Sequence, residues 1–440
     1  MFVFIMFESA IIAQNSHWQE TGGPAGIPRD VLNKIKDYLD IPHIISVVGV
    51  RRAGKSTLLH QVIQHLIKEK GVSPRNIFFF NLETPALSRF RNDITILDRL
   101  FEDYLKLAAP EGRIYTLLDE VQFFPEWQVF VKSRYEQQGI KFVVTGSNSR
   151  LLSSEFMTLL SGRTLPVEIF PFSFSEYIRA KGLTISDPLA AARGETRLRG
   201  LMDVYLREGG FPETVFIASQ ALRNEILVMY ARTILYQDIA PRFSIKKPAD
   251  LDDLFFYLLA NTANLFSYNR LSNLLGLHDK TVKEYISFFS DARLLFSVNA
   301  FSYSPRQQIR SPKKIYAIDT GLPGAAGFSF AENTGRLLEN LVFLSLKRRG
   351  GDIFYYRSAG GAEVDFLCWN GQKITALIQA AWEMSADATR TREIKSLRKA
   401  MDETGMREGL IVTHEDEEEI SDGERTIRVI PAYKFLMDLV

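Results

Sequence analysis

The sequence predicts an α/β fold in which a parallel sheet, covered by helices on both faces, is followed by smaller domains. Between about Ile44 and Pro171, short apolar runs alternate with helical patterns. The apolar runs are nearly continuous, which is typical of strands that are buried on both faces of a sheet. The chain has 440 residues, which is too long for one typical domain.

The elements follow one another in a clear order. The predicted strands of the sheet are Ile44–Val50, Asn76–Glu83, Arg113–Glu120, Lys141–Ser147 and Thr164–Phe170. Helices dominate to Lys247, and three helices with a hairpin-like stretch lead to Leu322. A helix, three strands, a helix and a strand complete the chain, with the acidic run 414–424 as a solvated loop. The predicted domains are a lead-in (1–35), the sheet core (36–180), a helical lid (181–247), a winged helix (248–322) and a C-terminal α/β domain (323–440).

Composition restricts the class of protein. Hydrophobic residues make up 46% and charged residues 24%, as in ordinary globular proteins, and the net charge of +1 requires any surface for nucleic acid to be local. The single cysteine, Cys368, excludes an internal disulfide bond and fits a reducing cytoplasm. The apolar residues 1–14 lack the basic region of a signal peptide, and no apolar run approaches the ~20 residues that span a bilayer. We therefore expect a cytoplasmic protein with no membrane partner.

The stretch "GVRRAGKST" carries the phosphate-loop pattern G-x-x-x-x-G-K-S between a predicted strand and a predicted helix, the context that this pattern requires. Its glycines allow backbone N–H groups to wrap phosphates at the positive end of the helix. We expect Lys55 to reach the β- and γ-phosphates of ATP and Ser56 to bind Mg²⁺. The predicted nucleotide contacts are Gly49, Arg51, Arg52, Ala53, Gly54, Lys55, Ser56 and Thr57. The alternative is a glycine-rich turn without a ligand.

A second acidic site lies in "YTLLDEVQ", at the end of another buried strand. Asp119 is predicted to hold Mg²⁺ through water, and Glu120 to act as the general base that activates the attacking water. An acidic pair at a strand end can instead cap the next helix. The adjacent glutamate favours hydrolysis over transfer to a small acceptor.

Further polar groups are expected near the γ-phosphate. Ser147 or Asn148, after the next strand, is a candidate sensor, although such residues also cap helices. An arginine is needed to neutralise charge in the transition state. The candidates are Arg51, Arg52, Arg163 and Arg242. We favour Arg163, because it follows the sensor segment and starts the next strand.

The motifs "GVRRAGKST", "LLDEVQ", "TGSNSRLL", "LSGR…IFPFSFSEY" and "GGFPE", in this order, resemble a family of bacterial and archaeal AAA-superfamily ATPases of poorly defined role. The resemblance extends from about Asp30 to the end of the chain. It implies a P-loop ATPase core, a winged-helix segment and a C-terminal domain related to restriction-endonuclease-like folds.

The winged-helix segment is a candidate DNA-binding surface. Residues 267–295 are predicted to form helix, turn and helix, and residues 296–319 a β-hairpin wing with a Pro/Arg/Lys tip. The cations that could meet phosphates are Lys280, Lys283, Arg306, Arg310, Lys313 and Lys314. The alternative is an interdomain or protein-binding module, because Asp279, Glu284 and Asp291 dilute the positive charge.

The C-terminal domain carries part of a nuclease constellation. In PD-(D/E)xK nucleases, a helix Glu, a strand Asp and a Glu-x-Lys on the next strand converge on Mg²⁺. Here Glu339 and Asp365 match the first two, but Gln379 and Ala381 stand where the second acid and the lysine are required. We expect a nuclease-like fold without cleavage.

The sequence therefore predicts an Mg²⁺-dependent ATPase whose cycle drives a conformational change that acts on DNA or on a protein partner. The alternative is a nucleotide-gated binding module, in which ATP occupancy rather than turnover controls partner binding. An ATP-powered DNA nuclease is disfavoured by the missing lysine.

Overall fold

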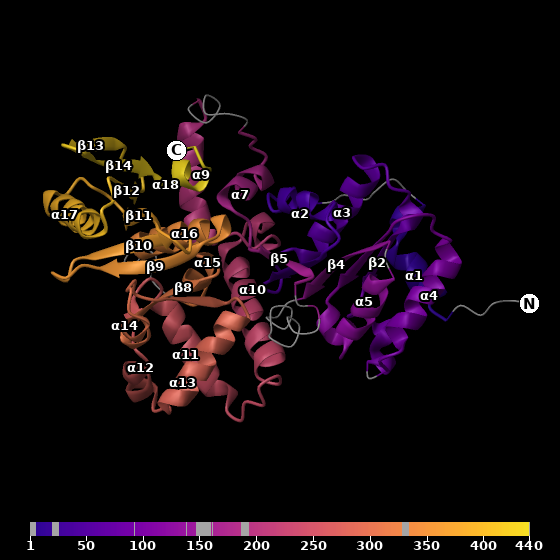
Figure 1. The fold of residues 1–440 in the computed structure, drawn as a ribbon. Helices are drawn as coiled ribbons and strands as arrows, with labels where there is room; N and C mark the ends of the chain where they lie inside the picture. The colour runs from indigo at the N-terminus through magenta and orange to yellow at the C-terminus, as the bar shows by residue number, and fades with distance from the viewer. Residues whose placement is uncertain are drawn as a thin grey trace, which may run out of the picture. The chain divides into compact units, whose positions relative to one another are not determined.

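The computed structural model describes residues 6–19, 26–91, 93–137, 139–146, 160, 162–185, 193–327 and 334–439. The chain divides into two compact units, residues 1–169 and 170–440 (Figure 1). The predicted lid, winged-helix segment and C-terminal domain all fall in the second unit, and their boundaries stay predictions. No helix in the described ranges is long and apolar enough to cross a bilayer.

The first unit is built on a five-stranded parallel sheet, as predicted, with the order β2-β3-β4-β1-β5. The strands are β1 (Ile44–Gly49), β2 (Ile77–Asn81), β3 (Ile114–Asp119), β4 (Ile140–Gly146) and β5 (Thr164–Ile169). Each strand of a parallel sheet ends at the same edge. Polar residues at the carboxyl ends of β1, β2, β3 and β4 are therefore gathered at one edge of this sheet. The first unit has the P-loop NTPase fold.

Helices cover this sheet. They are α1 (Glu8–Gln14), α2 (Leu32–Leu39), α3 (Lys55–Lys68), α4 (Ile96–Ala108) and α5 (Trp127–Glu136). Aromatic side chains fill the interface between β2 and α4, where Phe78 and Tyr104 are stacked with ring centroids 4.5 Å apart. Both side chains are almost completely buried, and burying a large apolar side chain contributes roughly 1.5–3 kcal/mol.

The second unit starts with helices α7 (Phe174–Ala180), α9 (Glu195–Glu208) and α10 (Gln220–Thr233). A π-helical turn, Ile234–Ile239, extends α10 before α11 (Pro248–Ala260). The "GGFP" motif closes α9 by a tight contact, because Gly210 N–H donates to Asp319 Oδ2 at 2.6 Å and Gly210 O accepts from Phe172 N at 2.7 Å. A Cβ atom on Gly210 would lie 2.4 Å from Phe172 O, so only glycine fits.

The predicted winged-helix segment contains α12 (Tyr268–Leu275) and α13 (Asp279–Asp291). A three-stranded antiparallel sheet flanks these helices in the sequence, in the order β6-β8-β7, from β6 (Leu265–Phe266), β7 (Leu295–Val298) and β8 (Lys313–Ala317). The predicted hairpin between β7 and β8 is present, but its tip is helical. Helix α14 (Pro305–Arg310) begins at a proline, which is favoured at the first helical position.

The C-terminal sheet is mixed and has the order β13-β14-β12-β11-β10-β9. Its helices are α16 (Thr334–Arg349), α17 (Asp387–Thr404) and α18 (Ala432–Leu436), whereas the preceding helix α15 (Gly321–Ala325) packs against α9 and α10. Its strands are β9 (Asp352–Arg357), β10 (Glu363–Trp369), β11 (Ile374–Ala381), β12 (Glu408–Thr413), β13 (Glu418–Asp422) and β14 (Arg425–Pro431).

The acidic run that we expected to be a solvated loop contains β13, so that expectation is wrong. This strand lies at the edge of the sheet, pairs only with β14 in the described structure, and turns Ile420 toward the apolar core. Charged side chains on an exposed edge discourage pairing with other chains.

Candidate functional site

The phosphate loop joins β1 to α3. Gly49 lies so close to β5 that a Cβ atom would be 2.3 Å from Ile169 O, and Gly54 has the left-handed φ of +94° that favours glycine. The loop therefore presents the start of α3, with its free N–H groups and positive dipole end, at the carboxyl edge of the sheet.

Lys55 is buried within this loop. Its Nζ lies 3.4 Å from Gly49 O, 3.5 Å from Val50 O and 3.5 Å from Glu120 Oε1. These distances are long for hydrogen bonds of a charged donor, which normally measure about 2.7–2.9 Å. The ammonium group therefore makes only weak contacts with these three oxygen atoms. Weak contacts suit a group that is proposed to exchange them for phosphate oxygens.

Ser56 and Asp119 form the second part of the site. Ser56 Oγ donates to Asp119 Oδ2 at 2.6 Å, and Asn81 Nδ2 donates to the same oxygen at 3.3 Å. Asp119 is fully buried. Burial raises the pKa of its carboxyl group, and the charge of Glu120 adds to this shift. A hydroxyl and a carboxylate in contact are oxygen donors of the kind that Mg²⁺ prefers, so these residues fit that ion.

Glu120 occupies a left-handed backbone conformation with φ of +55°, which is uncommon for a residue with a side chain. Its N–H donates to Thr145 Oγ1 at 3.1 Å, and its carboxylate accepts from Gln122. This turn directs Glu120 toward Lys55, so the acid is held beside the phosphate loop rather than in the sheet.

Several residues that support the site were not predicted from the sequence. Arg29 is buried in the lead-in, and its Nη1 donates to Ala53 O at 2.6 Å. Asn81 ends β2, Thr145 is one residue from the end of β4, and both hydrogen-bond to Asp119. A polar residue at the end of an apolar strand was the available signal for Asn81 and Thr145. Arg29 had no such signal, because it reaches the loop from a distant segment.

Other predicted residues do not join this cluster. Arg163 precedes β5, and its O accepts from Ile44 N, so it lies at the amino edge of the sheet. The six residues of β1 separate this edge from the phosphate loop, about 20 Å at ~3.3 Å per residue. This placement does not fit a role at the chain's own phosphate loop, and Arg163 instead pairs with Glu136 at 3.2 Å.

Two of the remaining candidates for contacts with the nucleotide are arginines of the phosphate loop that the structure describes. Arg51 pairs with Glu83 at 3.2 Å, and Arg52 has a left-handed φ of +70°. Asn148 and Ser147, the predicted sensors, lie outside the described residues. The nucleotide contacts of Gly49 to Thr57 stay a prediction.

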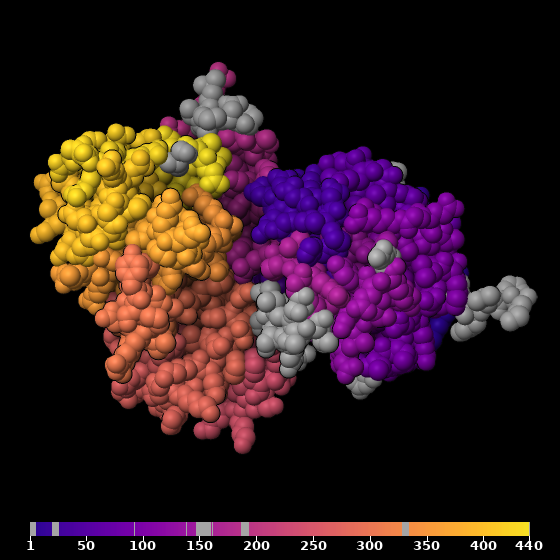
Figure 2. Space-filling view, viewed as in Figure 1, coloured from indigo at the N-terminus to yellow at the C-terminus, as the bar shows by residue number. Residues whose placement is uncertain are grey.

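The six cations of the winged-helix segment do not form one surface. Lys280 is highly exposed, and Arg306 and Arg310 are exposed on α14; the segment is drawn in salmon in Figure 2. Lys283 pairs with Asp279 at 2.6 Å.

The two lysines of β8 differ from the other four. Lys313 is partly buried and donates to Asn299. Lys314 is only 3% exposed, so our expectation that it meets DNA phosphates is wrong. Its side chain turns inward because carboxylates from α16 and β10 surround it.

The carboxylates of the C-terminal domain do come together. Glu339 on α16 and Asp365 on β10 both accept from Lys314 Nζ, at 2.9 and 2.8 Å. Gln379 also lies here, because its Oε1 accepts from Asp365 N at 3.1 Å and its Nε2 donates to Glu393 Oε2 at 2.7 Å. Ala381 is buried at the end of β11 and brings no polar group.

Three models of protein families match the chain. They are an AAA domain over residues 42–178, and two domains of unknown function, DUF8612 over residues 199–332 and DUF4143 over residues 334–435. Among solved structures, the Aeropyrum pernix ORC1 protein in complex with DNA aligns with a TM-score of 0.29 and 15% identity. That alignment covers 69% of this chain and 93% of the other, and a likeness at this TM-score supports no conclusion.

Two relatives align over most of their length. An uncharacterized protein of Haemophilus influenzae is 28% identical over 372 residues, which cover 83% of this chain and 89% of the relative. The uncharacterized protein MJ1544 of Methanocaldococcus jannaschii is 34% identical over 426 residues, which cover 92% of this chain and 91% of the relative. The chain therefore carries an AAA-type P-loop ATPase domain and belongs to the family that includes MJ1544 of Methanocaldococcus jannaschii.

Proposed function

We propose that this chain binds ATP with Mg²⁺, hydrolyses it, and uses the cycle to change conformation against a DNA or protein partner. The observation that carries this proposal is the convergence of Lys55, Ser56, Asp119 and Glu120 at the carboxyl edge of one parallel sheet. These four groups supply a cation for phosphate, oxygens for a metal ion and a base for water.

Each side chain has a distinct task. The buried ammonium of Lys55 neutralises phosphate charge, and the N–H groups at the start of α3 add to its effect. Ser56 and Asp119 hold Mg²⁺, which when bound supplies positive charge to the phosphate oxygens. Glu120 accepts a proton from the attacking water and orients it.

Neighbouring residues fix these groups in place. Thr145 bridges Asp119 and the backbone of Glu120, and Asn81 donates to Asp119. Such outer partners typically change metal affinity or activity by ~10–100-fold when they are removed. These contacts therefore restrain the proposed metal-binding acid and the proposed base relative to each other.

Steady-state ATP turnover in Glu120→Gln tests the proposal. The substitution removes the base but keeps the shape of the side chain, so ATP binding should persist while kcat falls by roughly 10²–10⁴-fold. Glu102→Gln is the matched control, because Glu102 is a partly exposed acid of the same unit that pairs with Arg134, between helices α4 and α5. Unchanged turnover in Glu120→Gln contradicts the assignment of the base.

A second candidate function has one observation in its favour. Glu120 contacts Lys55 and Gln122, which would restrain it from activating water until nucleotide displaces them. ATP occupancy alone could then switch partner binding. If a non-hydrolysable ATP analogue changes affinity for duplex DNA as fully as ATP does, while basal turnover is negligible, this nucleotide-gated module is the better description.

We also propose that the C-terminal domain has a nuclease-like fold that does not cleave. Glu339 and Asp365 lie close together, but Gln379 and Ala381 offer neither a carboxylate nor an ammonium group, and the nearby ammonium group of Lys314 is bound between the two acids. A domain with this composition would serve in binding. Incubating the protein with duplex, single-stranded and branched DNA in Mg²⁺ or Mn²⁺ tests this, and cleavage that disappears in Asp365→Ala contradicts it.

A further inference from the structure

A buried cluster of charge joins the two parts of the second unit. Lys314 Nζ lies 2.9 Å from Glu339, 2.9 Å from Glu363 and 2.8 Å from Asp365. The lysine comes from β8, next to the predicted winged-helix elements, whereas the acids come from α16 and β10. Tyr316 OH donates to the Glu339 carboxylate at 2.7 Å and closes one side of the cluster.

The ammonium group is fully used by these acids. A lysine has three N–H donors and no acceptor, and here three carboxylates surround it at hydrogen-bond distance. Burial alone would lower the pKa of Lys314, but the charge of Asp365 and the neighbouring groups raises it well above its usual value. Lys314 is therefore a permanent cation at the centre of the acids.

Formal charge shows that one lysine does not balance this centre. Three carboxylates face one ammonium group. Burial raises the pKa of Glu339 to about 7, and the charge of nearby Asp365 adds to that shift. A divalent cation would balance the three acids better than a monovalent one does.

The metal ion that a nuclease-like fold implies does not fit this centre. No group of three or more His, Cys, Asp or Glu side chains in the described part of the chain is arranged, as it stands, to hold a metal ion. The three acids instead stand at hydrogen-bond distance from nitrogen, while Mg²⁺ requires oxygens at about 2.0–2.1 Å. Lys314 Nζ occupies the point at which the carboxylates converge.

We propose that the ammonium group of Lys314 replaces the divalent metal ion of a nuclease-like centre and turns that centre into a fixed, metal-free anchor between β8 and the C-terminal sheet. This inference rests on the proposed nuclease-like fold and does not depend on ATP hydrolysis. It predicts that a latent metal site appears when the lysine is removed.

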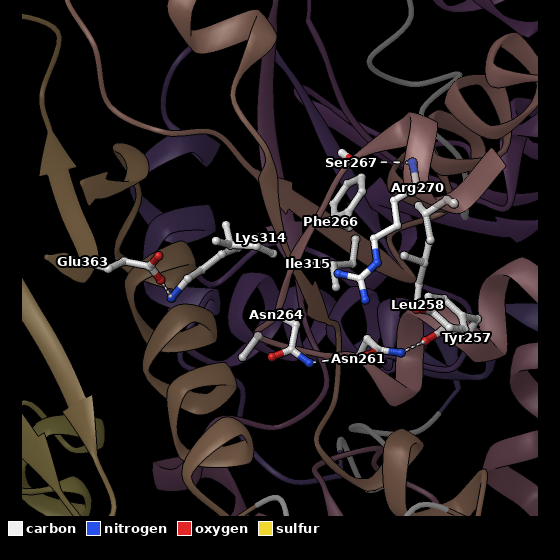
Figure 3. Close-up of a pocket in the computed structure, with 13 residues that line it drawn as sticks. Tyr257, Leu258, Asn261, Asn264, Phe266, Ser267, Arg270, Lys314, Ile315 and Glu363 are labelled. Atoms are coloured by element: carbon white, nitrogen blue, oxygen red, sulfur yellow. Dashed lines mark hydrogen bonds and ion pairs between the residues drawn. The ribbon is translucent and has the colours of Figure 1, made fainter. Parts of the chain in front are cut away.

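A pocket borders this centre on the side of Lys314 and Glu363. The cavity, of about 390 Å³, is lined in part by Lys314 and Glu363 on one side and by Arg270 on another (Figure 3). Glu363 is the most exposed of the three acids, at 30%, while Glu339 and Asp365 are 12% and 9% exposed. Shortening Lys314 would open a path from the pocket to the buried acids.

Metal binding to the full chain without nucleotide tests the proposal, with Mn²⁺ as the probe. Mn²⁺ prefers oxygen ligands, and free Mn²⁺ is counted by electron paramagnetic resonance. We expect Lys314→Ala to bind about one more Mn²⁺ per chain than the parent, since three carboxylates lose their only shared cation. Any binding at the phosphate loop is common to both proteins and cancels in the comparison.

Two further variants define the site. Lys313→Ala removes the adjacent lysine, which bonds to Asn299 outside the cluster, and should bind Mn²⁺ like the parent. Lys314→Ala combined with Asp365→Ala should lose the additional Mn²⁺. Basal ATP turnover is measured in all of them and should stay at the parent's rate, so failure of this inference is distinguishable from failure of the ATPase assignment.

Three results overturn the proposal. The first is an additional Mn²⁺ site already present in the parent and lost in Asp365→Ala, which means that metal and lysine coexist. The second is a folded Lys314→Ala that gains no Mn²⁺. The third result concerns a Lys314→Ala variant that does not fold on its own. In that case refolding in Mn²⁺ should restore the fold, and Lys314→Gln should gain the Mn²⁺ site. The proposal is overturned if neither happens.

Discussion

The hydroxyl group of Thr145, at the end of β4, donates a hydrogen bond to the carboxylate of Asp119, at the end of β3. The same hydroxyl accepts from Glu120 N at 3.1 Å. One small side chain therefore fixes both the proposed metal-binding acid and the backbone of the proposed base. This relationship exists because β3 and β4 are neighbours in a parallel sheet and end at the same edge.

Thr145→Val should lower kcat for ATP by roughly 10–100-fold, because it removes an outer partner of the metal-binding acid without changing the shape of the core. The binding of ATP should change less, since the contacts of the phosphate loop stay intact. Steady-state kinetics with nucleotide-binding titrations measures both quantities.

Thr116→Val is the matched control. Thr116 is fully buried on β3, and its hydroxyl has no hydrogen-bond partner in the described structure. Replacing an unsatisfied hydroxyl with a methyl group is expected to be neutral or stabilising. Equal kcat values in Thr145→Val and Thr116→Val would contradict a special role for Thr145.

The exposed cations of α14 should carry DNA affinity if the segment binds DNA. Double substitution Arg306→Ala/Arg310→Ala should weaken binding and reduce the slope of log affinity against log salt by about 1.8, at ~0.9 per lost phosphate contact. Lys36→Ala/Lys70→Ala is the control, because these lysines form surface ion pairs in the first unit. Fluorescence anisotropy across a salt series distinguishes the two, and identical slopes contradict the proposed contacts.

Replacing Gly210 by alanine should lower the stability of the protein, whereas replacing Gly200 by alanine should raise it. A Cβ atom on Gly210 would meet Phe172 O at 2.4 Å, so Gly210→Ala should destabilise the second unit by at least ~1–3 kcal/mol. Gly200 lies exposed in the middle of α9 with nothing within 4 Å of an added Cβ. Gly200→Ala should stabilise by roughly 0.5–1 kcal/mol, because it reduces the backbone entropy of the unfolded chain.

Denaturant unfolding followed by circular dichroism measures both changes. If the two substitutions have the same sign, the close approach at Gly210 does not determine the local fold.

The sheet and the phosphate loop were predictable because their signals are local. Near-continuous apolar runs identify strands that are buried on both faces, and G-x-x-x-x-G-K-S carries its own strand and helix context. The direction of the strands decides where Arg163 lies, because a residue that directly precedes a strand of a parallel sheet lies at the amino edge, away from the phosphate loop. The predicted parallel sheet already contained this information, and the choice of Arg163 overlooked it.

Burial of charge was the least predictable feature. Lys313 and Lys314 look alike in sequence, as adjacent lysines beside a proline. Alternation along β8 sends only Lys314 inward, and its acids arrive from segments 25 and 51 residues away. A charged side chain is read as exposed unless its partners are known, and these partners depend on the tertiary fold.

The pH dependence of stability should depend on Asp319, which is 3% exposed and accepts from Gly210 N and Gly321 N. Burial raises the pKa of its carboxyl group from 3.8 to about 6, although the two N–H donors oppose that shift. The folded state therefore binds this proton more tightly than the unfolded state does. Stability contributed by the neutral form is present below about pH 4 and is lost as pH rises toward 6.

Asp319→Asn removes this titration. The difference in unfolding free energy, parent minus variant, should fall by roughly 2.4 kcal/mol between pH 4 and pH 7, at ~1.4 kcal/mol per pKa unit. Taking the difference cancels the titration of other groups, including Glu339. The amide of the variant can accept only one of the two hydrogen bonds that the backbone N–H groups donate to Asp319. This loss shifts the difference in unfolding free energy by the same amount at every pH. A difference that stays constant or rises across this range would show that Asp319 is not the group that binds the proton.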